Sequence, residues 1–287
     1  MKLPVLLIML LTGISPVAQT INEGLLIHYP FDGNSKDLSG NQYHGKDYGV
    51  KYGIDRFNNP NSACYFDGLD DYIEFPNRPE LKPDLPVSFS FWVKYNSVDF
   101  GHRIILNTSH ESDRASGVCF VYHASTGKYS MGYRDGSFYF SPATRRNLIS
   151  TAVIDTSQWH YIIAIISGAR DMVLYVDCKN HGGEYVGAGG ELFYSDQPGC
   201  IGRHDSNIGL DDLFFKGVLD EFRYWDKALN SVEIDTICNR FFYAKNPDDG
   251  PDGEPEENGN LLIFPNPAET KLHFITALED LSEIKIF

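Results

Sequence analysis

The chain has 287 residues, of which 39 are Asp or Glu and 24 are Lys or Arg, so its formal net charge is −15. This charge argues against a nucleic-acid partner, because phosphate binding requires a basic face. The 26 glycines, 17 tyrosines and 19 phenylalanines are typical of many strands joined by tight turns. The length allows one large all-β domain with appendages, or two ordinary domains.

Residues 1–20 have the pattern of a secretory signal peptide. Lys2 precedes an apolar run from Leu3 to Ile14, and Ala18 offers a small residue before a cleavage point. The run is too short to span a bilayer as a mature helix, and no other segment is long and apolar enough to span one. We therefore expect an exported chain without a transmembrane segment.

The exported part contains all five cysteines, and disulfides persist outside the cytoplasm. An odd number leaves at least one free thiol, and no C-x-x-C pair indicates a zinc site. Cys178 and Cys200 flank one Gly-rich excursion and are the predicted disulfide. The alternative is that most cysteines are small buried apolar residues.

Short strands are predicted along most of the chain after residue 24. Gly24 to Asp32 is the first, and polar turn clusters follow it. Pro86 to Lys94 alternates large apolar residues with serines, which predicts one apolar face. Trp159 to Ile166 is continuously apolar and is expected to be a central strand. The other predicted strands lie near residues 62–75, 103–106, 118–122, 128–133, 137–140, 148–153, 172–176 and 201–203. Regular spacing of this kind is typical of a β-sandwich.

The stretch from Lys216 to Ile234, KGVLDEFRYWDKALNSVEI, predicts a late core strand. Regular alternation places Asp220 on one face of that strand, with Phe222, and Glu221 on the other. A carboxylate among large apolar neighbours needs a partner, because an unpaired buried charge is costly.

A short helix is predicted directly after this strand. Asn230 stands three residues before Glu233, which is the spacing of a capping box. Val232, Ile234 and Ile237 are expected to form the apolar stripe of the helix.

Several of these stretches resemble one family. LIHYPFDGNSKDLSGNQYHG at residues 26–45 is similar to the opening motif of LamG-like domains, and SACYFDGLDDYIEF at 62–75 resembles a later one. WHYIIAII with MVLYV resembles a family hairpin, although Cys178 stands where glycine is usual, and DEFRYWDKALNSVEI resembles the closing signature. Residues 21–243 are thus identified as a LamG-like domain of the concanavalin A-like lectin/glucanase superfamily. The resemblance implies an all-β fold, a two-sheet antiparallel jelly-roll sandwich.

The resemblance also implies a structural calcium ion, because many family members hold one where the two ends of the jelly roll meet. Asp32, Asn34 and Asp220 would supply side-chain oxygens and His44 its backbone carbonyl, and such hard ligands suit Ca²⁺. The alternative is that Asp32 caps its turn and Asp220 pairs with an arginine or a backbone N–H.

No constellation of residues indicates catalysis. The glucanases of this superfamily carry E-x-D-x-x-E or E-x-D-x-E on a strand, which places two carboxylates at glycosidase separation, and neither motif occurs. G-x-S-x-G is also absent. Asp220 and Glu221, on opposite faces, would not flank one bond, and His160 is expected in the core or at its rim. Asp70-Asp71 is either a second calcium point or a solvated turn.

The C-terminal part differs in composition from the rest. Residues 244–260 form an acidic Pro/Gly linker that is unable to bury a core. Residues 261–287 contain IFPNPAETKLHF, which resembles the start of a type IX secretion C-terminal sorting domain of Bacteroidetes, a small β domain. This resemblance implies contact with the type IX secretion machinery.

Together these features predict a secreted or cell-surface, non-catalytic binding module with a structural calcium ion. Its expected partner is a carbohydrate or a surface protein. The middle of the chain is rich in Tyr and Arg, which stack on sugars and make forked hydrogen bonds, but no individual contact residue is singled out. The alternatives are a divergent glycoside hydrolase or lyase of the same fold, and a purely structural adhesin module.

Overall fold

The computed structural model describes residues 21–96, 102–109, 114, 116–137, 142–151, 153–203 and 214–242, and the pairs 263–264 and 273–274. The chain divides into two compact units, Met1–Ala244 and Lys245–Phe287. In the second unit, β17 (Ile263–Phe264) pairs antiparallel with β18 (His273–Phe274). The predicted signal peptide and nearly all of the predicted linker and sorting segment lie outside the described residues.

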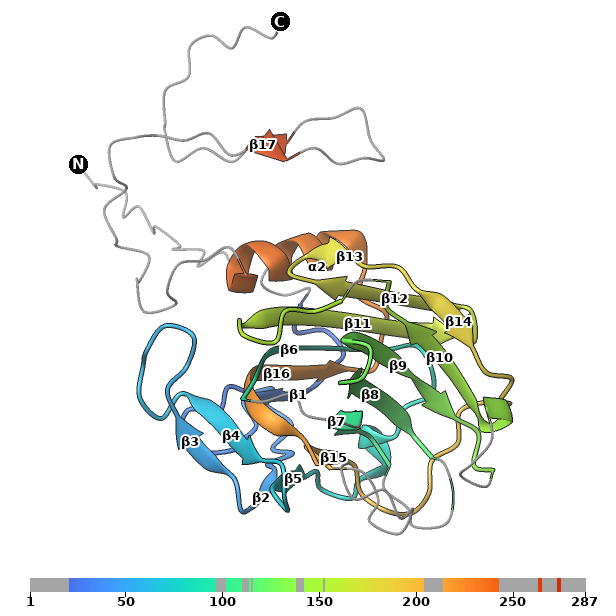
Figure 1. The fold of residues 1–287 in the computed structure, drawn as a ribbon, viewed down its shortest axis with the longest axis horizontal. Coiled ribbons are helices and arrows are strands. Elements are labelled where there is room, and N and C mark those ends of the chain that lie inside the picture. Colours follow the sequence, from blue (N-terminus) through green and yellow to red (C-terminus); the bar gives the residue numbers. More distant parts are fainter. Residues whose placement is uncertain are drawn as a thin grey trace, which may run out of the picture. The chain divides into compact units, whose positions relative to one another are not determined.

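The described part of the first unit forms two eight-stranded antiparallel sheets, as Figure 1 shows. In sheet A the order is β13 (Lys179–Asn180), β12 (Asp171–Val176), β11 (His160–Gly168), β6 (Val87–Tyr95), β16 (Lys216–Trp225), β4 (Ala63–Asp67) and β3 (Lys51–Gly53). The first strand, β1 (Leu25–Tyr29), also pairs with β16. In sheet B the order is β14 (Glu184–Val186), β10 (Arg145–Ile149), β9 (Lys128–Arg134), β8 (Val118–His123), β7 (His102–Asn107), β15 (Cys200–Ile201), β5 (Tyr72–Glu74) and β2 (Lys46–Tyr48). The predicted jelly-roll sandwich is confirmed.

The sandwich is closed at both sides by chain that crosses from one sheet to the other. β2 and β3 are separated by two residues and form edges of different sheets; β13 and β14, separated by three residues, form the other edges. These edge strands are two or three residues long. Short edges leave few unpaired backbone groups for another chain to bind.

The main core lies between the sheets and contains the inward-facing aromatic residues of β6, β8, β9 and β16. Phe91 of sheet A packs edge-on against Phe120 of sheet B, with ring centroids 5.3 Å apart. Phe222 packs on Phe91 from the neighbouring strand, at 6.3 Å. The predicted apolar face of 86–94 is confirmed by this arrangement.

Sheet A is buried on its outer face as well. In β11, Ile162 and Ile166 belong to the main core, whereas Tyr161 and Ile163 belong to a second apolar cluster on the outer face. Because neither face of this strand meets water, every position from Tyr161 to Ile166 is apolar. The continuous apolar run at 159–166 thus marks a central strand, as predicted.

A short helical segment covers this outer cluster. Helix α2 (Ser231–Ile237) begins with the predicted capping box, in which Asn230 accepts from the Glu233 N–H and Glu233 accepts from the Asn230 N–H. A π-helical turn, η4 (Cys238–Phe242), continues it. Ile234 and Ile237 face the sheet as expected, but Val232 is 62% exposed, so its assignment to the apolar stripe was wrong. Short 3₁₀ turns occur at η1 (Pro79–Leu81) and η2 (Pro142–Thr144).

The predicted Cys178–Cys200 disulfide is wrong. Cys178 is bonded to Cys238, with a Cα–Cα distance of 5.8 Å and a sequence separation of 60. Cys200 lies on β15 of sheet B, where its thiol donates to the Arg203 carbonyl oxygen at 3.3 Å. The two cysteines that are close in sequence therefore belong to different sheets. Three free, buried cysteines remain, Cys64, Cys119 and Cys200.

The disulfide joins η4 to the two-residue turn between β12 and β13. Asp177 and Cys178 form this turn with φ values of 51° and 58°, the left-handed region that the usual glycine would favour. Cys178 thus adopts the strained conformation that the family pattern implies. The disulfide holds this residue and, through it, the end of the covering helix.

No helix in the described part of the chain combines the length and the apolarity that a membrane span requires.

Candidate functional site

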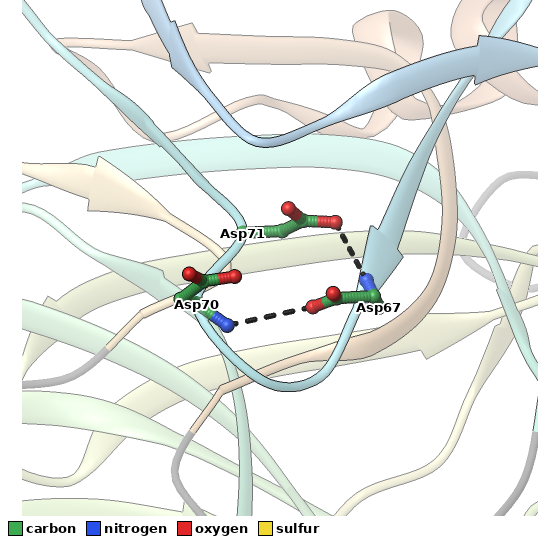
Figure 2. Close-up of side chains that lie close together, drawn as sticks. All are labelled: Asp67, Asp70 and Asp71. Carbon is green, nitrogen blue, oxygen red and sulfur yellow. Dashed lines mark hydrogen bonds between the residues drawn. The ribbon is translucent and has the colours of Figure 1, made fainter.

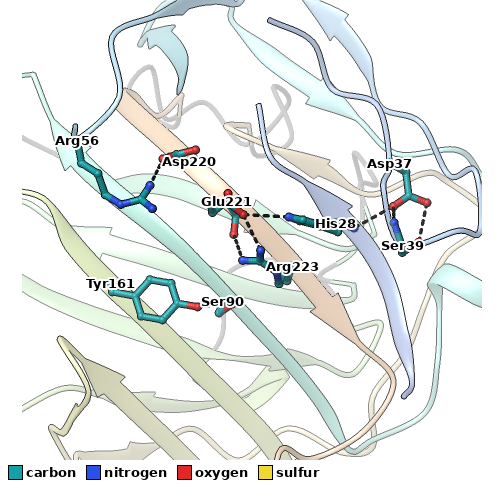
Figure 3. A network of polar contacts seen from close by, with 9 residues as sticks. All are labelled: His28, Asp37, Ser39, Arg56, Ser90, Tyr161, Asp220, Glu221 and Arg223. Atoms are coloured by element: carbon teal, nitrogen blue, oxygen red, sulfur yellow. Dashed lines mark hydrogen bonds and ion pairs between the residues drawn. The ribbon is translucent and has the colours of Figure 1, made fainter. Parts of the chain in front are cut away.

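A β-bulge in β16 places two acids on the same outer face of sheet A. The register between β16 and β6 shifts between Asp220 and Arg223, and Glu221 has a φ of 54°. Leu219 and Phe222 point into the core, while Asp220 and Glu221 both bond to groups on the outer face (Figure 3). The expectation that these acids face opposite sides was wrong, because an extra residue breaks the alternation.

Asp220 forms an ion pair with Arg56, which reaches it from the loop after β3 (Figure 3). This loop is shaped by Asp55, whose carboxylate accepts the N–H groups of Phe57 and Asn59, both at 2.8 Å. The Arg56 guanidinium also lies 4.7 Å from the ring centroid of Trp92. The alternative in which Asp220 pairs with an arginine is therefore confirmed.

Arg56 does not offset all of the negative charge around Asp220, which is only 2% exposed. Burial raises the pKa of Asp220 well above its ordinary value, and Arg56 opposes this effect. The carboxylates of Glu221, Asp55 and Asp32 raise this pKa further. Burial is therefore the largest cause of the raised pKa, and the neighbouring acids add to it.

Glu221 is bound by an arginine and a histidine side chain. Its Oε2 accepts from Arg223 Nη2 at 2.6 Å and from His28 Nε2 at 2.9 Å. Burial alone would raise the pKa of Glu221, but Arg223 and His28 outweigh it and hold the pKa at about 2. Arg223 in turn lies 4.0 Å from the ring centroid of Phe241 in η4. Glu221 therefore connects the first strand, the last strand and the covering turn.

The opening motif forms a polar loop organised by Asp37. The carboxylate of Asp37 accepts from the N–H groups of His28, Ser39 and Tyr43, at 2.8–3.0 Å. The Asp37 N–H donates to His44 Nδ1 at 3.0 Å. The D-x-S-G-N-x-x-H pattern is thus explained by one buried carboxylate that holds the loop onto β1.

The predicted calcium ligands fit a cation in part. Asp32 lies near enough to Asp220 for its charge to raise the pKa of Asp220, so two acids share one environment. Asn34 bonds within its own turn, donating to the Asp32 carbonyl at 2.8 Å and accepting from the Lys36 N–H at 2.9 Å. The ring of His44 is held by Asp37, and the resemblance implies its backbone carbonyl instead. The two carboxylates are the donors that a hard cation prefers.

A second group of acids lies in the turn between β4 and β5, as Figure 2 shows. Carboxylate oxygens of Asp67, Asp70 and Asp71 lie within 4.8 Å of one another. Asp71 accepts from the Asp67 N–H at 2.8 Å, and Asp67 accepts from the Leu69 N–H at 2.7 Å. Burial raises the pKa of Asp71, and the charges of Asp67 and Asp70 add to this effect. The acids at 70 and 71 thus belong to a hydrogen-bonded turn.

The outer face of sheet B carries arginines in place of ion-paired acids. Arg134 of β9 and Arg145 of β10 are direct cross-strand partners. Met131 and Leu148 point into the core, so the alternation of both strands places these arginines on the outer face. Arg134 donates to Asn147 Oδ1 at 2.9 Å.

Comparison with known families decides the classification. A family model described as the concanavalin A-like lectin/glucanases superfamily matches residues 66–235, more than half of the chain. The chain belongs to this superfamily. Among curated proteins, no sequence relative was found.

Solved structures of this superfamily fold are similar to the chain at low sequence identity. One is domain 4 of AbnA, a GH43 extracellular arabinanase from Geobacillus stearothermophilus, in complex with arabinotriose; identity is 19%, TM-score 0.56, and 74% of this chain and 97% of that chain are covered. Another is the binding domain of Paraclostridial Mosquitocidal Protein 1, with 16% identity, TM-score 0.57 and coverage of 76% and 52%. A third is the receptor binding domain of botulinum neurotoxin D, with 16% identity, TM-score 0.54 and coverage of 76% and 53%. The chain spans about half of these two toxin domains, and the likeness concerns the fold.

The superfamily pattern did not reveal the residues that surround Asp220. Arg56 comes from a loop with no motif, and only its position after a turn-forming Asp55 could have drawn attention to it. The bulge at Glu221 has no glycine to mark it. The strand predicted near 137–140 lies mostly outside the described residues; β9 pairs with β10, and this pairing sets Arg134 opposite Arg145.

Proposed function

We propose that this chain is a secreted or cell-surface binding module that recognises a carbohydrate without cleaving it. One observation carries the proposal: the adjacent acids of the closing motif are used in ion pairs on a covered face. Asp220 is 2% exposed and bonds to Arg56, and Glu221 bonds to Arg223 and His28. A glycosidase needs two carboxylates on either side of an accessible bond. The arrangement supports a structural role for both acids.

The similar structures support the choice of a carbohydrate ligand. The arabinanase domain was crystallised with arabinotriose, and a related toxin binding domain was solved in complex with SialylT. Another complex of the same toxin domain contains rat synaptotagmin II, so protein is the competing ligand class. Arg134 and Arg145 on the outer face of sheet B favour a hydrogen-bonding ligand over an apolar protein surface.

The proposed route out of the cell combines the N-terminal signal peptide with the type IX sorting segment at 261–287. The disulfide between Cys178 and Cys238 supports an oxidising destination, because such bonds are rare in the cytosol. Cleavage after export, read from the N-terminal mass of the secreted chain, tests this part. Retention of the exported chain inside cells when residues 261–287 are deleted would support the sorting role.

We also propose that Asp32 and Asp220 hold a structural calcium ion, with Asn34 and the His44 carbonyl completing the set. The acids near Asp220 whose charges raise its pKa, Asp32 among them, support this assignment. Bound calcium would neutralise the acids and join the first strand to the last. The ion would act through its charge alone and would take part in no reaction.

Binding of the purified chain to an array of neutral, carboxylated and sulfated glycans tests the main proposal. Retention of at least one glycan class, with no new reducing ends released from it, is the expected result. Release of reducing ends would favour the glycoside hydrolase or lyase alternative. Binding to surface proteins without any glycan binding would favour the adhesin alternative.

Thermal unfolding in calcium and in a chelator tests the metal site. A ligand that binds only the folded chain at 100 times its dissociation constant stabilises it by about 2.7 kcal/mol. Calcium should raise the midpoint of the unmodified chain and not that of Asp220→Asn. Asp71→Asn, in the acidic turn, is the matched control and should keep the response. An equal response in the Asp220→Asn and unmodified chains would reject this site.

A further inference from the structure

Two positive charges face each other directly across β9 and β10. Arg134 and Arg145 are register partners, and cross-strand partners hold their Cβ atoms about 5 Å apart. Like charges in this position repel and destabilise a sheet. Such a pair therefore destabilises the fold unless a ligand outside the sheet binds it.

No carboxylate in the described part of the chain forms an ion pair with either arginine. The adjacent acid, Asp135, is engaged elsewhere, because its carboxylate accepts from the N–H groups of Ser137 and Gly190 at 3.0 and 2.8 Å. Burial lowers the pKa of Arg145, and the nearby charge of Arg134 lowers it further. A chain of net charge −15 has many acids, so this local lack of a counterion is notable.

The backbone that carries the two arginines is held in place by the segment from Gly187 to Ser195. The Gly189 N–H donates to the Arg145 carbonyl at 3.0 Å, and the Phe193 N–H donates to the Arg134 carbonyl at 2.9 Å. Arg146, which points the other way, donates to the Gly189 carbonyl at 2.6 Å. Arg134 is further oriented by Asn147. The two guanidinium groups thus extend from a fixed platform.

We propose that Arg134 and Arg145 form a subsite for the acidic group of a sugar, either a carboxylate or a sulfate. The proposal rests on the carbohydrate-binding function above and narrows it to acidic glycans. A guanidinium group makes two parallel hydrogen bonds to a carboxylate or sulfate, and a pair of them encloses one acidic group from two sides.

The charge of the whole chain restricts this ligand further. A dense polyanion would place many negative charges against a protein of net charge −15 and would be repelled beyond the subsite. The preferred ligand therefore carries isolated acidic groups among neutral sugars. A glycan with occasional uronic acids or single sulfates meets this condition better than a heavily sulfated chain.

The test compares binding of the purified full chain to matched glycans on an array: neutral, carboxylated and sulfated forms of the same backbones. A neutral oligosaccharide that carries a single uronic acid and its carboxyl-reduced form make one matched pair for titration. A peptide carrying phosphoserine is included as a different source of an acidic group. Arg145→Gln and Arg134→Gln remove one guanidinium each, and Arg145→Lys keeps the charge without the fork.

Arg170→Gln is the matched control, because Arg170 is exposed in the β11–β12 turn of sheet A and carries the same charge. We expect the glutamine variants to bind the acidic glycan at least tenfold more weakly, and Arg145→Lys several-fold more weakly. Arg170→Gln should change binding less than twofold. Unfolding midpoints that are not lowered in any variant would show that the weaker binding does not come from a destabilised fold.

Three outcomes overturn the assignment in different ways. Equal binding of neutral and acidic forms, or full binding by Arg145→Gln, rejects the subsite while the carbohydrate-binding function stands. Tighter binding of the phosphoserine peptide than of any glycan would show that the subsite binds a protein ligand and not a sugar. Failure to bind any glycan rejects the proposed function itself.

Discussion

The charged side chains on the outer faces of the two sheets have different surroundings. On sheet A, Asp220 and Glu221 are matched by Arg56 and Arg223 and lie beneath η4. On sheet B, Arg134 stands opposite another arginine, without an acidic partner among the described residues. A charge that is paired and covered supports the fold, because exposing or unpairing it is costly. A charge that is exposed and repelled by its neighbour is available for a ligand.

The largest difference between the two faces should come from the disulfide, which secures the cover of sheet A. Replacing Cys178 and Cys238 together by serine should lower the free energy of unfolding by about 4 kcal/mol, from the entropy of a loop of this length. Chemical denaturation measures the loss. Added reductant should destabilise the unmodified chain and leave the double variant unchanged. Equal stability of both chains would mean that the cover of sheet A does not depend on this bond.

The next largest effect should come from the pair beneath that cover. Arg56→Leu leaves the Asp220 carboxylate buried without its partner, which costs about 3–5 kcal/mol. The double variant Arg56→Leu/Asp220→Leu should recover most of this loss, since no unpaired charge remains. Arg170→Leu, which removes an exposed arginine, is the control and should change stability little. A loss of free energy of unfolding below about 1 kcal/mol for Arg56→Leu would show that this pair contributes no more than a surface salt bridge.

The helix cap should have a smaller effect on the covered face. Asn230→Ala removes the side-chain acceptor of the capping box and should cost about 1 kcal/mol. Val232→Ala in the same helix alters a side chain that is 62% exposed and should cost almost nothing. Equal effects of the two substitutions on the denaturation midpoint would contradict the role assigned to the cap.

A pH-dependent effect is expected at the edge of sheet A, beside the disulfide turn. His160 bonds to Asp177 Oδ2 at 2.8 Å and to the Asp155 carbonyl at 2.6 Å. Burial lowers the pKa of His160, but these oxygens outweigh it and raise the pKa above 6.5. The folded chain therefore binds this proton more tightly than the unfolded chain does. Its contribution to stability is present below pH 6.5 and is lost as the pH rises through the folded pKa.

Unfolding midpoints between pH 5 and 9 measure this contribution, and His160→Gln should remove it. His181 supplies a control of opposite sign, since burial lowers its pKa below 6.5. The contribution of His181 is present above pH 6.5 and is lost as the pH falls through the folded pKa. His181→Gln should therefore flatten the profile on the acidic side. Identical profiles for the two variants would show that neither histidine is coupled to folding as described.

The smallest expected effect lies on sheet B and has the opposite sign. Arg145→Gln removes a like-charge contact with Arg134 and should raise the free energy of unfolding by up to about 0.5 kcal/mol. Denaturation at low salt gives the clearest measurement, because salt screens the repulsion. Destabilisation by this substitution would indicate that Arg145 supports the fold, and the contrast between the two faces would disappear.

Local patterns predicted the strands and the helix cap because each depends on residues close together in the chain. The apolar run at 159–166 needed only its own composition to indicate a strand buried on both faces. The capping box at Asn230 needed only its spacing to Glu233. The faces of the two acids of β16 were misassigned because the bulge at Glu221 adds one residue and interrupts the alternation of side chains between the two faces. The disulfide was misassigned because partners for Cys178 were sought nearby in sequence.

The sequence by itself determined the jelly-roll class, the order of its main strands and the identity of Asp220 as a buried acid. The jelly-roll class follows from the family resemblance of motifs of about twenty residues, the strands from their periodicity, and the burial of Asp220 from its large apolar neighbours. All of these features involve residues that are close together along the chain. Only the tertiary structure decided that Arg56 is the partner of Asp220 and that Cys238 is the partner of Cys178. It also decided that Arg134 faces Arg145, with no acid paired to either among the described residues. Each of these depends on which strands become neighbours, and the packing of the whole sandwich sets that choice.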